Sequence, residues 1–73
     1  MGEQDVYSLP DAALVDTRAA AKILGLSAAT LQTWRCLGRG PAYRRLDRAI
    51  RYSVGVLRAW ADRNTITPGS QAE

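Results

Sequence analysis

The chain has 73 residues, of which ten are basic and seven acidic, and its formal net charge is +3. It has no histidine and a single cysteine, Cys36, which excludes an internal disulfide, a His/Cys zinc cluster and a histidine-dependent nucleophile. A chain this short forms one domain that buries only about 60% of its unfolded surface, so we expect neither an enzyme nor a bound cofactor. The apolar runs are too short to span a bilayer and the first residues are acidic, which predicts a cytoplasmic protein without a membrane partner.

The charges are distributed unevenly along the chain. Residues 1–17 carry four acidic side chains and no base, whereas residues 18–58 carry nine bases against Asp47 alone. A concentrated positive segment is the pattern expected of a protein that binds a polyanion. A general preference for arginine would explain why the bases are arginines, but not why acids are excluded from the same segment.

Residues 1–13 are polar and acidic and predict a flexible arm, followed by a brief extended segment at Leu14-Val15. Two short helices are then predicted, over 18–24 and 28–37. Thr17 and Ser27 are the expected N-caps, because a hydroxyl there accepts a bond from an unpaired first-turn N–H.

The two helices are separated by a tight break, where Gly25 supplies the left-handed residue that ends the first of them. Each helix carries an apolar stripe at helical spacing, so the two must pack against each other at a steep angle. This geometry is a helix-turn-helix, whose second helix is usually offered to the DNA major groove. The expected stripes are Ala20, Ile23 and Leu24 in the first helix and Leu31, Trp34 and Leu37 in the second.

Beyond a Gly- and Pro-containing break the pattern becomes alternating. Residues 43–46 and 50–52 predict a small hairpin whose tip is residues 47–49. Ser53 is the expected cap of a last helix over 54–63, and residues 64–73 predict a flexible tail. Helix, turn, helix, hairpin and helix together predict a winged helix-turn-helix, a mainly α fold with a small β-hairpin wing, over residues 14–63.

An ordered set of motifs carries a resemblance to a known family. The motifs are residues 17–27, Thr30-Leu31 with Trp34, Gly40-Pro41-Ala42-Tyr43, Ile50-Arg51-Tyr52 and Leu57-Arg58-Ala59-Trp60. Over about residues 14–62 the chain resembles the MerR-type winged-helix family. Within it the chain is most similar to the compact phage excisionases, also called recombination directionality factors, and to small prophage transcriptional regulators.

The resemblance implies a nucleoid-associated bacterial protein that binds double-stranded attachment-site DNA, with bending and cooperative self-association. Its partner would be a phage integrase, which it directs toward excision. The chain lacks the long coiled-coil helix and effector domain of full MerR regulators, which favours the excisionase branch.

The outward face of the second helix is the expected base-reading surface, with Ala29, Gln32, Thr33 and Cys36 at positions that enter the major groove in the excisionases. Gln32 is the best reader, because its amide can pair with adenine N6 and N7 at once. Thr33 can reach a base edge or a thymine methyl group. Ala29 is small enough to let the helix approach closely.

Phosphate and minor-groove contacts are predicted for the remaining members of the site. Thr30 and Arg35 flank the groove-facing strip, and Arg18 lies in the first turn of the first helix, where a helix N-terminus and a guanidinium can share a phosphate. An arginine is favoured in a narrow, A·T-rich minor groove, and the hairpin tip is the expected source of such contacts. The predicted DNA-binding set is Arg18, Ala29, Thr30, Gln32, Thr33, Arg35, Arg45, Arg48 and Arg51.

Other interpretations of the same residues stay open. A small prophage transcriptional regulator would use the same surface as an excisionase, and Gln32 and Thr33 also fit an ordinary solvated helix face. A protein-interaction module, antitoxin-like or an assembly subunit, would use the acidic arm and the arginines to bind protein. Core positions, rather than base-stacking roles, are expected for Trp34, Tyr52 and Trp60.

Overall fold

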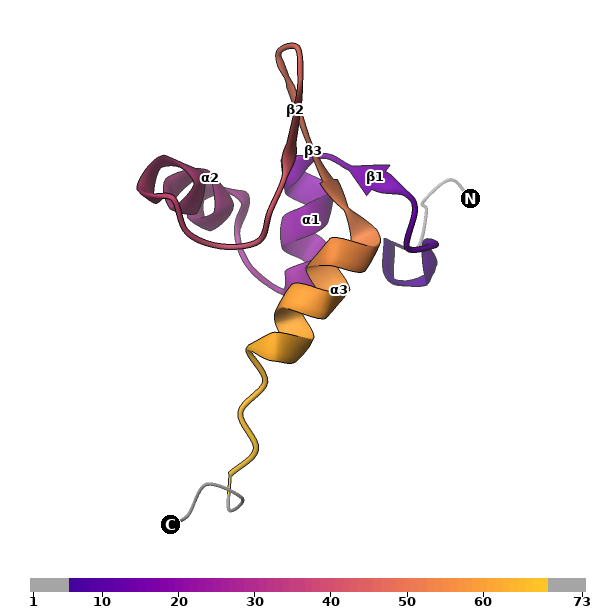
Figure 1. Ribbon diagram of the computed structural model, residues 1–73, viewed down its shortest axis with the longest axis vertical. Helices are drawn as coiled ribbons and strands as arrows, with labels where there is room; N and C mark the ends of the chain where they lie inside the picture. Colours follow the sequence, from indigo (N-terminus) through magenta and orange to yellow (C-terminus); the bar gives the residue numbers. More distant parts are fainter. Residues whose placement is uncertain (1–5, 69–73) are drawn as a thin grey trace.

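A computed structural model describes residues 6–68 of the chain. The domain consists of three helices and a small antiparallel sheet, in the order that the sequence predicts (Figure 1). The elements are the 3-10 turn η1 (Val6–Ser8), β1 (Leu14–Val15), α1 (Thr17–Leu24), α2 (Ala28–Leu37), β2 (Arg44–Leu46), β3 (Ala49–Ser53) and α3 (Val54–Arg63). The predicted winged helix-turn-helix architecture is confirmed.

The first helix starts one residue earlier than expected. Asp16, not Thr17, is the N-cap of α1, and its carboxylate accepts the Ala19 N–H at 2.9 Å. Aspartate and threonine are both good caps, and the Thr17 hydroxyl is used elsewhere, as described below. At the other end, Gly25 adopts the left-handed conformation (φ 72°) that turns the chain toward α2.

The second helix has the predicted bounds. The Ser27 hydroxyl accepts the Thr30 N–H at 3.1 Å, as an N-cap should, and the helix ends at Gly38. Leu31 is buried with 1% of its surface exposed, but Leu37 is 59% exposed, so its assignment to the core is wrong. Leu37 is the last residue of α2, where the described part of the chain leaves more than half of it uncovered.

The sheet has the strand order β1-β3-β2, with both pairs antiparallel. The expected extended segment at Leu14-Val15 is an edge strand on β3, where Val15 pairs with Tyr52. The hairpin tip is shorter than predicted, because Ala49 already pairs with Leu46 and only Asp47 and Arg48 remain in the turn. Asp47 has a φ of 62°, a conformation that aspartate tolerates better than most residues.

One core holds these elements together, with at least one buried side chain from each helix and from β1 and β3. Its buried members are Val15, Ala20, Ala21, Leu31, Tyr52, Val54 and Leu57. The predicted core position of Tyr52 is confirmed at 1% exposure. Trp34 and Trp60 are only half-buried and pack on each other at the margin, with ring centroids 5.7 Å apart.

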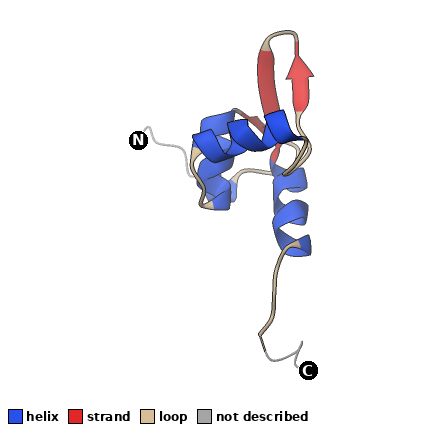
Figure 2. Cartoon of the chain, turned by 90° about the vertical axis from the view of Figure 1, so that its left-hand side faces the viewer, coloured by secondary structure: helices blue, strands red, loops and turns tan. Residues whose placement is uncertain are grey.

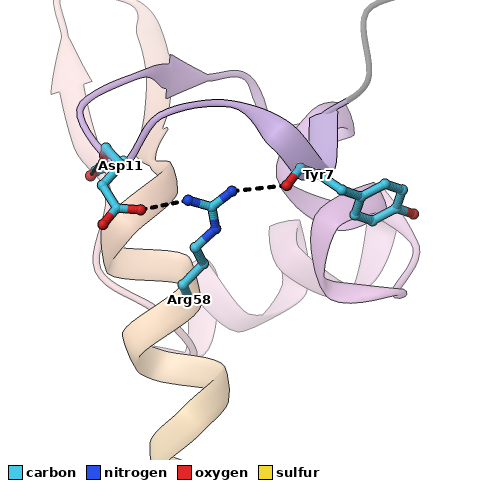
Figure 3. Close-up of polar contacts among 4 residues, drawn as sticks. Tyr7, Asp11 and Arg58 are labelled. Atoms are coloured by element: carbon cyan, nitrogen blue, oxygen red, sulfur yellow. Dashed lines mark hydrogen bonds and ion pairs between the residues drawn. The ribbon is translucent and has the colours of Figure 1, made fainter.

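Part of the expected arm is docked on the domain rather than free. The Asp11 carbonyl accepts the Gly55 N–H at 3.0 Å, and the Arg58 guanidinium donates to the Asp11 carboxylate and to the Tyr7 carbonyl (Figure 3). This docking also changes the start of α3, because the Ser53 hydroxyl donates to the Asp11 carbonyl and makes no cap bond. Ser53 is therefore not the side-chain cap that the sequence predicts.

The two chain ends leave the domain in different ways. Residues 64–68 continue from α3 as exposed, irregular chain that points away from the hairpin (Figure 1). The remainder of the predicted arm, residues 1–5, and of the predicted tail, residues 69–73, lie outside the described residues.

Candidate nucleic-acid interface

The exposed face of α2 is the outward face that helical spacing predicts. Ala29, Gln32, Thr33 and Cys36 are all exposed, whereas Leu31 faces the core. In Figure 2, α2 lies across the front of the molecule with the hairpin rising beyond it. A macromolecule bound to this side of the domain would therefore contact both α2 and the hairpin.

Two of the predicted phosphate contacts, Arg18 and Thr30, lie in the first turns of α1 and α2 and differ in exposure. Arg18 is exposed, but the Asp16 carboxylate already occupies the N-terminal end of α1. A helix N-terminus with its own carboxylate attracts a phosphate less, so Arg18 would act mainly through its own charge. Thr30 is half-buried and its hydroxyl is hydrogen-bonded to the Ser27 hydroxyl at 2.9 Å.

Arg35 has a structural role that the sequence interpretation missed. It is half-buried, and its Nη1 donates to the Tyr52 hydroxyl at 2.9 Å and to the Thr17 hydroxyl at 3.2 Å. The guanidinium also lies over the Tyr43 ring, 5.6 Å from its centroid. Arg35 thus connects α2 to α1 and to both sides of the hairpin base.

A sequence signal for this role exists. Arg35 is four residues after the buried Leu31, so the two side chains share one face of α2. The expected exposure of Arg35 beside the groove-facing strip is not what the structure shows. A phosphate contact by its remaining N–H groups is still a prediction.

The hairpin arginines lie on different faces. Directly paired residues of an antiparallel ladder share a face, and Arg44 pairs with Arg51 while Arg45 pairs with Ile50. Arg45 is therefore on the opposite face of the hairpin from Arg51. The sequence-based prediction had placed both arginines in the same set of wing contacts. Arg44, which was not in the predicted set, joins Arg51, and Arg48 is exposed in the turn.

The Arg44–Arg51 pair has an electrostatic cost. Like charges directly opposite each other on a ladder destabilise it, and an anion placed between them removes that repulsion. Arg51 is partly held by a hydrogen bond from its Nη1 to the Ile50 carbonyl at 2.8 Å. Of the nine bases in residues 18–58, only Arg58 is in an ion pair within residues 6–68. The other eight have no acidic partner among these residues, although Arg35 and Arg51 donate hydrogen bonds within the domain.

Within residues 6–68, no three His, Cys, Asp or Glu side chains come together in a way that could hold a metal ion. No helix among these residues is long and apolar enough to cross a membrane.

Comparison with known proteins agrees with this geometry. A family model described as a helix-turn-helix domain matches residues 14–65, from the start of β1 to two residues beyond α3. No curated protein matches the chain.

Proposed function

This chain belongs to the helix-turn-helix domain family, a DNA-binding class, and from that premise we propose that it is an excisionase of the MerR-type branch. In this role it binds double-stranded attachment-site DNA, bends it, assembles cooperatively on it and directs a phage integrase toward excision. The observation that carries the proposal is the pairing of an exposed helix face with an arginine-bearing hairpin that Arg35 fixes beside it.

In the proposed complex, α2 is the recognition helix in the major groove and the hairpin is the wing at the adjacent minor groove. Gln32 supplies a bidentate contact to adenine, with Thr33 and Ala29 at the same surface. Arg18 and Thr30 contact phosphates. Arg48 and Arg51, with Arg44 beside them, contact the minor groove or its edges.

The small number of base-reading groups favours an architectural role. The exposed face of α2 offers one amide and the Thr33 hydroxyl, so each copy discriminates weakly between base sequences. Selectivity then depends on DNA shape and on several copies bound side by side. A factor of this kind suits the assembly of a bent recombination complex.

The proposed biological role is tested by excisive recombination. Purified integrase, its attachment sites and this protein are combined, and excision products are counted with and without the protein. We expect excision to depend on the protein and to fall in the Gln32→Ala variant. Excision that is unaffected by the protein, together with repression of a reporter gene, would favour the prophage regulator instead.

Two substitutions on the recognition side are expected to differ in kind. Gln32→Ala should lower the discrimination between cognate and random duplex by about 1–3 kcal/mol, the usual contribution of a good bidentate base contact. Arg18→Ala should weaken binding to both duplexes equally, as a phosphate contact would. Fluorescence anisotropy on the two duplexes measures both effects. An unchanged cognate preference in Gln32→Ala would mean that α2 does not read bases as proposed.

The wing is expected to sense the width of the minor groove. Arg48→Ala and Arg51→Ala should weaken binding most when the flanking base pairs are A·T-rich, since the narrow groove attracts a guanidinium most strongly there. Arg63→Ala is the matched control, because Arg63 ends α3 on the side away from the hairpin (Figure 1). Equal losses on A·T and G·C flanks would mean that the wing touches only phosphates, and no loss would mean that it faces away from DNA.

A further inference from the structure

A small basic pocket lies between the end of α2 and the start of β2. Its volume is about 320 Å³, and it is lined by Arg35, Arg39, Tyr43 and the chain from Gly38 to Ala42. Arg39 was not in the predicted DNA-binding set. The pocket lies where the chain leaves the recognition helix and enters the wing.

Within residues 6–68, no acidic side chain forms an ion pair with the two arginines of this pocket. None of its lining residues is acidic. Arg35 is held by two hydroxyl groups, which fix its position without cancelling its charge. The C-terminal end of α2 contributes about half a negative charge, which the two guanidinium groups outweigh.

The loop that shapes the pocket is restricted at two consecutive residues, Gly40 and Pro41. Gly40 has a φ of 87°, and a Cβ at this position would lie 2.7 Å from Cε3 of Trp34, so the backbone is pressed onto the tryptophan ring. Pro41, which follows, is buried and has a restricted φ. Because Gly40 and Pro41 restrict the loop and Arg35 is already hydrogen-bonded, the exposed Arg39 is the basic side chain of the pocket that would lose most freedom when an anion binds.

We infer that this pocket holds one backbone phosphate of the bound duplex, with Arg39 as its main donor and Arg35 as a fixed charge behind it. The inference rests on the proposed binding mode. If α2 is in a major groove and the wing is at the adjacent minor groove, the sugar–phosphate backbone that separates the two grooves passes between them. The pocket is located between these two elements, and a phosphodiester is the anion that reaches it.

The test pairs a protein substitution with a DNA substitution. Duplexes carrying a single neutral methylphosphonate at successive positions are titrated with wild-type protein and with Arg39→Gln. We expect methylphosphonates at several contacted positions to weaken wild-type binding, and at one of them the loss of the pocket contact should weaken it about tenfold, near the lower end of the contribution of a hydrogen bond to a charged group. At that position Arg39→Gln should show no further loss, because the contact is already absent.

Two further readouts separate this contact from a general charge effect. Arg39→Gln should reduce the slope of log K against log salt by about 0.9, and should weaken cognate and random duplexes alike. Arg63→Gln removes the same charge from the end of α3 and should leave the methylphosphonate pattern unchanged. Thermal unfolding of each variant confirms that it is folded.

The inference is overturned if Arg39→Gln binds like wild type, or if its losses add to that of every methylphosphonate. In either case wild-type binding to the unmodified duplex persists, and the proposed function stands. If wild-type protein does not bind duplex DNA at all, the proposed function fails together with the inference. The two failures are therefore distinguishable.

Discussion

Tyr52→Ala is expected to remove a large part of the stability of the domain. The Tyr52 side chain is 1% exposed, packs on Tyr43 with ring centroids 5.9 Å apart, and accepts the hydrogen bond from Arg35. Truncating a buried aromatic side chain costs about 3–5 kcal/mol. At roughly 0.05–0.15 kcal/mol per residue, a domain of this size has only about 4–11 kcal/mol of total stability.

Urea unfolding followed by circular dichroism measures this effect. Tyr52→Phe is the matched control, since it keeps the ring and removes only the hydroxyl that Arg35 contacts. That variant should stay folded and lose at most about 1.5–3 kcal/mol, the value of a hydrogen bond to a charged group. A Tyr52→Ala variant with the urea midpoint of wild type would show that Tyr52 does not organise the core.

Local sequence signals were sufficient for most of the fold. The bounds of α2 follow from Ser27 and Gly38, which act only on their immediate neighbours in the chain. The docking of residues 6–13 could not be predicted in this way, because Tyr7 and Asp11 are held by Arg58, about 50 residues later. A contact of such sequence separation leaves no periodic pattern in either segment.

The hairpin shows how a small error in a turn changes a predicted site. A three-residue tip at residues 47–49 would pair Arg45 with Arg51, so the two would share a face. The observed two-residue tip shifts the register and pairs Arg51 with Arg44 instead. The sequence predicts that the wing carries arginines. The face of the hairpin on which each arginine lies depends on whether Ala49 belongs to the turn or to β3.

At the candidate site, the exposed face of α2 could be predicted from the sequence, but the contacts of Arg35 could not. Helical spacing was enough to identify which α2 side chains are exposed, including Gln32 and Thr33. Spacing alone could not identify the partners of Arg35, which come from α1 and β3. A charged residue on the inner face of a helix has such a role only where other elements bring acceptors to it.

In the proposed complex, the arginines of α1, the loop after α2 and the wing neutralise phosphates of duplex DNA. Each phosphate neutralised releases condensed counterions, which contributes about −0.9 to the slope of log K against log salt. With about four to six phosphates contacted, we expect a slope of roughly −4 to −5. Between 50 and 200 mM salt this corresponds to a loss of about 250- to 1,000-fold in affinity, the largest effect on binding that we predict.

The most direct measurement is therefore a salt titration of the wild-type protein on a fluorescently labelled duplex. The affinity should fall steeply and linearly on logarithmic axes, with the slope given above. Arg48→Ala, which removes one exposed wing charge, should give a shallower slope, whereas Arg63→Ala should not. A wild-type slope near zero would contradict the account, because binding would then not depend on phosphate neutralisation by the arginines.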